Sequence, residues 1–278
     1  MKLARFAILT ICGFAVFALT MTFAPLLPSW GNYAARGGLL FLFGVLWLAA
    51  RGERLRPYRP VFFACFTATA ALSLAYYFSD YGLALFHLTT ATPAGAAAGK
   101  ASQALVTVAG VLLLAKLSGQ DLGSLYIRKG RLALGLGLGL AGAALFVCVT
   151  FIPGGPFFSA ASTAGGFGKL AALVPWVLLF VLSNAFMEEL LFRGLFLGRF
   201  EALTGKWLAL LSTTLVFALA HMQVTYTAQV AGFVAFVFVL GLLWGLLMQK
   251  SKSIWGSVLF HAGADVAVIL PIMQGMGS

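Results

Sequence analysis

The stretch NAFMEELLFRG, residues 184–194, places two adjacent carboxylates and an arginine in a run that is otherwise almost wholly apolar. Glu189 and Arg193 are four residues apart with the acid first, which favours an ion pair on one helix face. Glu188 points about 100° away from that face, so one carboxylate is neutralised and the other is left over. We interpret Glu189–Arg193 as a structural pair and Glu188 as the working group. The alternative is a purely structural buried ion pair.

Two histidines lie in similar apolar runs. His221 ends the run LVFALAH, four residues after Phe217, and His261 is followed four residues later by Asp265. Counting 1.5 Å per residue from the nearest basic flank places Glu188, His221 and His261 roughly 14–22 Å deep in the membrane. We therefore expect these three side chains to line one cavity. A carboxylate in such a desolvated cavity can take a proton from water and later deliver it to a leaving amine.

The elements that must position these residues are membrane helices. A composition of 62% hydrophobic and 9% charged residues is that of a polytopic membrane protein. Several apolar runs are long enough to cross the bilayer, and none alternates in the manner of a membrane β-strand. We predict an all-α bundle of eight or nine spans. They lie at about 6–27, 37–50, 61–79, 100–116, 132–152, 169–198, 207–221, 230–248 and 253–272, with 81–98 ambiguous.

The net charge of +11 comes largely from basic residues in short clusters between these runs. This distribution is typical of the positive-inside bias, so we predict a lipid bilayer and no nucleic acid as the partner. A nine-span arrangement has the N-terminus in the cytoplasm and leaves Arg36, Lys100 and Lys169 on the opposite side. The Arg-rich loop 51–60 also fits attraction of anionic headgroups, although a topology signal is the favoured interpretation.

The chain shows no linker or charge-rich insertion, so we predict one membrane domain over residues 1–278. Residues 137–142 match the pattern GxGxxG, but they lie inside an apolar run that no strand precedes, so this match does not predict a nucleotide site. The spacing of Gly135 and Gly139 instead predicts a small-residue face that lets two membrane helices approach closely.

Taken in order, Glu188-Glu189-x-x-x-Arg193, Phe217-x-x-x-His221 and His261-x-x-x-Asp265 resemble the three-motif signature of the CPBP intramembrane proteases. This family, also called Abi, includes the CAAX proteases and bacteriocin-processing enzymes. The resemblance covers about residues 165–275, the predicted catalytic core. It implies an endopeptidase in a bacterial-type plasma membrane, with an active site reached from the cytoplasm. The implied substrates are membrane-anchored, prenylated or leader-bearing proteins and peptides.

The resemblance also implies roles for the motif residues. Glu188 would be the general base that activates water, with His221 as its partner in holding that water. His261 and Asp265 would stabilise the oxyanion. The last motif ends in Asn in many relatives, and an ionised Asp265 would repel an oxyanion. Asp265 therefore either donates as a protonated acid or orients and charges His261, and we favour the second role.

The remaining motif residues, Glu189, Arg193 and Phe217, would support the first of these helices and the site. A zinc ion held by Glu188, His221 and His261 is the main alternative mechanism, because two histidines and a glutamate form a known catalytic set. The sequence has no HExxH motif, and we favour a mechanism without a metal or other cofactor.

Two other functions compete with proteolysis. A proton-coupled transporter would use the buried acids and histidines as a relay, but the chain has no evident paired halves or inverted repeats. A non-catalytic scaffold or immunity protein would keep the same motifs without cleaving a substrate.

Overall fold

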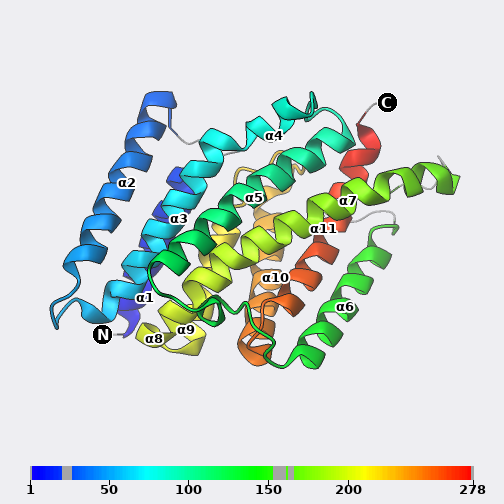
Figure 1. Cartoon of the computed structure of the whole chain (residues 1–278). Coiled ribbons are helices and arrows are strands. Elements are labelled where there is room, and N and C mark those ends of the chain that lie inside the picture. The colour runs from blue at the N-terminus through cyan, green and yellow to red at the C-terminus, as the bar shows by residue number, and fades with distance from the viewer. Residues whose placement is uncertain (1, 21–26, 153–160, 162–165, 277–278) are drawn as a thin grey trace.

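The computed structural model describes residues 2–20, 27–152, 161 and 166–276. Within these residues the protein is helical and has no strand, and eight helices are long and apolar enough to cross a membrane. The predicted all-α class with eight or nine spans is therefore confirmed, and the architecture fits an integral multi-pass membrane protein (Figure 1). The long helices are α1 (Lys2–Thr20), α2 (Ser29–Ala49), α3 (Arg59–Phe78), α5 (Pro93–Leu117), α6 (Leu132–Val149), α7 (Gly166–Glu189), α10 (Val230–Ser251) and α11 (Trp255–Gly275).

Several predicted boundaries were wrong at the helix starts. Helix α2 begins at Ser29 rather than at residue 37, and α5 begins at Pro93 rather than at residue 100. Thr92 caps α5 by accepting a hydrogen bond from Gly95 N at 3.1 Å, and proline suits the first helical position. The ambiguous segment 81–98 is thus divided between the short helix α4 (Asp80–Leu85) and the first turns of α5.

Two further predictions concern single spans. The expected span 207–221 is α9 (Lys206–Leu219), whose 14 residues are fewer than a membrane crossing needs. The C-terminal part of the expected span 6–27 falls on residues 21–26, outside the described residues, as does residue 165 at the start of the predicted core. Helix α1 begins at the lower end of the bundle in Figure 1 and α11 ends at the upper end.

Arg36 was expected outside the membrane, just before the span predicted at 37–50, but it is buried within α2. Its guanidinium donates to Asn32 Oδ1 at 2.8 Å, to Thr20 O at 2.9 Å and to Leu72 O at 3.2 Å. A buried charged group is tolerated where such hydrogen bonds replace water, so Arg36 ties α2 to the neighbouring helices.

The helix that holds the paired glutamates changes its winding directly after them. Helix α7 ends at Glu189 and continues as the π-helix η3 (Leu190–Leu197) and then as α8 (Gly198–Thr204). All eight residues of η3 are buried. Arg199 donates to Gly194 O at 3.3 Å and to Leu195 O at 2.5 Å, so the next helix supplies partners for carbonyls of the wider turns. Such π turns occur often at functional sites.

Helices α6 and α11 pack backbone against backbone. A Cβ atom added at Gly139 would lie 2.5 Å from Gly256 O and 3.0 Å from Gly256 Cα, closer than real contacts allow. Gly135 faces the same residue from one turn away. The predicted small-residue face is therefore confirmed, and α11 is the helix that holds His261.

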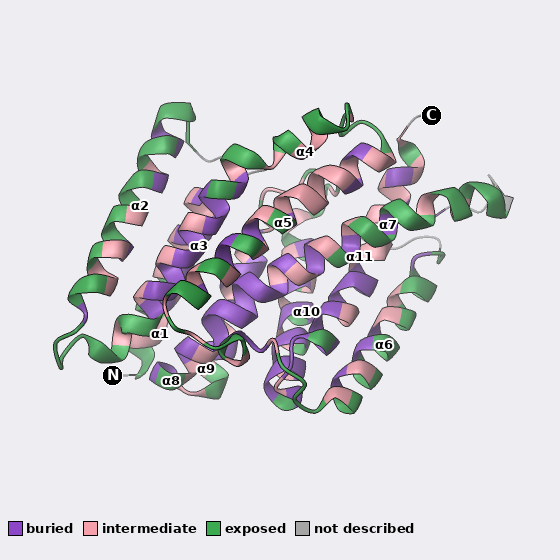
Figure 2. Ribbon diagram, viewed as in Figure 1, coloured by how far each residue is buried: buried purple, intermediate pink, exposed green. Residues whose placement is uncertain are grey.

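Buried residues concentrate on the central helices, whereas α2 and α6 expose one side each (Figure 2). The exposed side chains on these two outer helices are large and apolar, for example Phe41, Leu48, Leu138 and Leu145. An exposed apolar face is expected where lipid, not water, covers the protein. The second half of α7 and the start of η3 enclose Asn184, Glu189 and Arg193 among the buried polar residues.

We predict that Gly139→Val lowers the stability of the fold by about 1–3 kcal/mol, because the added carbons must displace the rigid backbone of Gly256. Gly137→Val is the matched control on the same helix, since an added Cβ there meets nothing within 4 Å. The measurement is the thermal unfolding midpoint of each variant in detergent micelles. Equal shifts in the two variants would contradict the proposed contact.

Candidate active site

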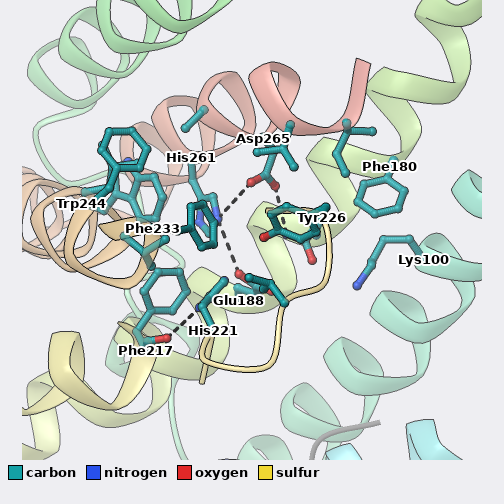
Figure 3. Close-up of a pocket in the computed structure, with 18 residues that line it drawn as sticks. Lys100, Phe180, Glu188, Phe217, His221, Tyr226, Phe233, Trp244, His261 and Asp265 are labelled. Carbon is teal, nitrogen blue, oxygen red and sulfur yellow. Dashed lines mark hydrogen bonds and ion pairs between the residues drawn. The ribbon is translucent and has the colours of Figure 1, made fainter. Parts of the chain in front are cut away.

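The structure brings the motif residues of three different helical segments to one cavity of about 220 Å³. Glu188 reaches it from α7, His221 from the turn after α9, and His261 and Asp265 from α11 (Figure 3). Phe217 also lines this cavity. The expectation that Glu188, His221 and His261 share one cavity is therefore met in the structure.

Glu189 does not line the cavity but lies behind the residues that do, and it connects two other motif residues. Its Oε1 atom accepts a hydrogen bond from Arg193 Nη1 at 2.9 Å and lies 3.0 Å from His261 Nδ1. The side chains of Glu189 and Arg193 are 0% exposed. Arg193 also donates to Gly241 O at 3.2 Å, and its guanidinium carbon lies 4.3 Å from the centre of the Phe217 ring. The pair predicted from the i,i+4 spacing is present, and it is buried.

The hydrogen-bond partners of His261 indicate which of its two ring nitrogens is protonated. A carboxylate paired with arginine only accepts hydrogen bonds, so the Nδ1 atom facing Glu189 is protonated. The other ring nitrogen, Nε2, faces the cavity, 3.5 Å from Glu188 Oε2 and 3.5 Å from Asp265 Oδ1. The ring is stacked on Trp244 of α10, with ring centres 3.9 Å apart. His261 is therefore fixed in orientation, with Nε2 between two acids.

His221 is oriented by the backbone of its own motif. Its Nδ1 atom lies 2.8 Å from Phe217 O, four residues earlier, at the end of α9. A helix leaves its last carbonyls without intrahelical partners, and a carbonyl only accepts hydrogen bonds. Nδ1 of His221 is therefore the protonated nitrogen, and Nε2 of the neutral ring is left as an acceptor.

Glu188 has the fewest contacts of the motif acids. Its side chain is 18% exposed, and its closest ion-pair contact among the described residues is the 3.5 Å separation from His261 Nε2. Its Oε2 atom is buried and makes no hydrogen bond to the described part of the protein. The side chain as a whole still lines the cavity, so a molecule that enters the cavity contacts Glu188.

Sequence reasoning missed several residues of this cavity. Asn184 donates to Asp265 Oδ2 at 2.9 Å, and Lys100, Tyr226 and Trp244 also line the wall. Asn184 lies four residues before Glu188, and this spacing in an apolar helix was an available indication. Lys100 had been placed with the flanking charges, whereas its ammonium group donates to Gln103 Oε1 at 3.0 Å and lies 5.5 Å from the centre of the Phe180 ring.

The donor groups of the site do not form the ligand set that the zinc alternative needs. Among the described residues, no group of three or more His, Cys, Asp or Glu side chains is arranged to hold one metal ion. The Nδ1 atoms of the two histidines contact Glu189 and Phe217 O, which orients both rings and leaves each Nε2 atom to bind a ligand. The metal-free mechanism stays a prediction.

Comparison with known proteins agrees with the motifs. No curated protein and no solved structure matched the chain. One family model, described as type II CAAX prenyl endopeptidase Rce1-like, matches residues 170–267. This range extends from α7 to α11 and includes every motif residue named above. The resemblance to the CPBP and CAAX proteases is therefore confirmed over residues 170–267, which are similar to the Rce1-like family.

Proposed function

We propose that the protein is an intramembrane endopeptidase in which Glu188 activates the attacking water. The observation that supports this most directly is the position of Glu188, whose side chain is 18% exposed and lines a cavity with two oriented histidines. The adjacent Glu189 is held by Arg193 and His261 behind the same wall. The two neighbouring carboxylates thus have different surroundings and are suited to different tasks.

The first step of the proposed reaction is attack by water. Glu188 accepts one proton of a water molecule while the water oxygen bonds to the carbonyl carbon of the substrate. His221 accepts a hydrogen bond from the same water through Nε2, because its Nδ1 proton is already donated to Phe217 O. The product of this step is a tetrahedral intermediate with a negatively charged oxygen.

His261 is placed to stabilise that oxygen. When Nε2 of His261 is protonated, the ring is a cation held by Glu189 on one side and by Asp265 on the other. Its Nε2–H group can then donate a hydrogen bond to the oxyanion. Asp265 in this arrangement orients and charges His261, and Asn184 fixes the carboxylate of Asp265. Collapse of the intermediate breaks the C–N bond, and Glu188 returns its proton to the leaving amine.

The shape of the site supports a membrane-associated substrate. The cavity wall is largely aromatic and aliphatic, with Phe180, Phe233, Phe236 and Trp244 among its residues. Glu188 and His221 also line a smaller cavity of about 60 Å³, next to Phe17 and Leu72. Two cavities that meet at Glu188 and His221 offer apolar space on both sides of a scissile bond. We propose prenylated, leader-bearing or membrane-anchored chains as substrates.

We predict that Glu188→Gln lowers the rate of cleavage by at least about 100-fold, because the amide cannot accept the proton of water. The assay uses protein in liposomes and a panel of fluorogenic peptides with and without a prenyl group. His221→Gln, which keeps a polar side chain of similar length, is expected to lower kcat in the same assay. Full activity of Glu188→Gln would contradict the proposed role.

We predict different effects on stability for the two adjacent glutamates. Glu189→Gln removes the charge that balances the fully buried Arg193 and is expected to destabilise the fold by roughly 3 kcal/mol. Glu188→Gln changes a partly exposed group and is expected to cost less than about 1 kcal/mol. Unfolding midpoints in detergent compare the two isosteric changes. A larger loss in Glu188→Gln would reverse the assignment of the structural and the working carboxylate.

We predict that a zinc chelator leaves the cleavage rate unchanged and that purified active protein contains far less than one metal ion per chain. The measurements are the rate after dialysis against 1,10-phenanthroline and elemental analysis of the same sample. Loss of activity that added zinc restores would favour the metal-dependent alternative instead.

A further inference from the structure

A larger cavity, about 740 Å³ in volume, lies beside α8, the helix that follows η3, and is lined by arginines. Arg56 is in the short 3₁₀ helix η1 (Arg56–Tyr58), Arg59 begins α3, Arg128 follows the 3₁₀ helix η2 (Leu122–Leu125), and Arg199 is in α8. These elements meet at the lower end of the bundle in Figure 1, near the start of α1. The fold thus gathers four cations from three separate segments of the sequence.

No carboxylate of the described residues forms an ion pair with these cations. Among the described residues that line the cavity there is no Asp or Glu, and none of the four arginines has a carboxylate within the ion-pair distance of 4.0 Å. Arg128 donates to Lys252 O at 2.8 Å, and the 9% exposed Arg199 donates to carbonyls of η3 and to Gln120 Oε1. All of these partners are neutral. Four like charges around one space repel each other unless an anion enters it.

The exposed pair, Arg56 and Arg59, has free donors. Neither side chain makes a hydrogen bond or an ion pair in the described part of the protein. The guanidinium group presents several N–H donors in a fork that matches the oxygens of a phosphate.

The position of the cavity indicates the source of the phosphate. It lies where α2 and α5 end and α3 begins, which is the end of three membrane helices. Trp47 and Tyr126 also line it, and aromatic rings of this kind are frequent at the level of lipid headgroups. Basic pockets between membrane helices bind anionic headgroups. We propose that this cavity is a binding site for a phosphate group, supplied by the headgroup of an anionic phospholipid.

The site is independent of the proposed peptidase activity, but one residue contacts both regions. Arg199 lines the phosphate cavity and donates to Gly194 O and Leu195 O of η3, the segment that follows Glu188 and Glu189. A phosphate bound at Arg199 therefore contacts the side chain that holds the helix of the two glutamates in place.

The test compares two double variants in the same loop. Arg56→Gln/Arg59→Gln removes two guanidinium groups from the cavity wall, and Arg51→Gln/Arg54→Gln removes the same charge from exposed residues that do not line it. Binding of phosphatidylglycerol and of phosphatidylcholine to the full-length protein in detergent is measured by native mass spectrometry. We expect phosphatidylglycerol to be preferred, and this preference to fall at least about tenfold in the first variant and less than about twofold in the second.

Three outcomes distinguish a specific site from general attraction. Equal loss in both double variants means attraction to the basic loop as a whole, and it would overturn the proposal, as would equal binding of the two lipids by the unmodified protein. If instead inorganic phosphate alone binds saturably, and only Arg56→Gln/Arg59→Gln weakens it, the phosphate site stands and the lipid source is wrong. The four substituted residues are exposed, and unchanged unfolding midpoints confirm that the variants are folded.

Discussion

The arrangement of the candidate site depends on one carboxylate oxygen. Glu189 Oε1 is shared by Arg193 and His261, and all three side chains are nearly or fully excluded from solvent. Because charge cannot be left unbalanced in such surroundings, this contact fixes α7 against α11 and aligns the imidazole ring. The stacked Trp244 and the backbone acceptor at Gly241 extend the same restraint to α10. Because Glu189 forms these contacts with Arg193 and His261, they do not depend on the adjacent Glu188.

Much of the site was predictable because its residue types are costly in a membrane. Acids and histidines in apolar runs are rare enough that Glu188, His221 and His261 stood out, and similar depths indicated that they meet. The tautomers were not predictable, since they depend on which oxygen each ring faces in space. Trp244 was missed because a tryptophan in an apolar helix has no distinguishing neighbour in sequence. Lys100 was missed because a lysine near the start of a span looks like a flanking charge.

The helical class followed from composition, but the helix ends did not. The first turns of α2 and α5 contain Ser, Asn, Arg, Pro and Gly, so a search for apolar runs begins too late in both. Their polar groups are satisfied by caps and by contacts with other helices, which apolarity does not report. A close helix contact on this face of α6 was predictable, because two glycines four residues apart in a membrane helix leave a groove that a second backbone can enter, whereas its partner α11 was not.

The π-helix η3 has a consequence for the register of the chain. In a π turn the hydrogen bonds run from residue i to i+5, so every side chain that follows is set back in rotation relative to an unbroken α-helix. The faces that α7 and α8 present to the bundle therefore differ in rotation from those that an unbroken α-helix of the same length would present. A helical wheel drawn through residues 166–204 mixes two periodicities. The loss or gain of a single residue among residues 194–197 would alter this phase while leaving every motif intact.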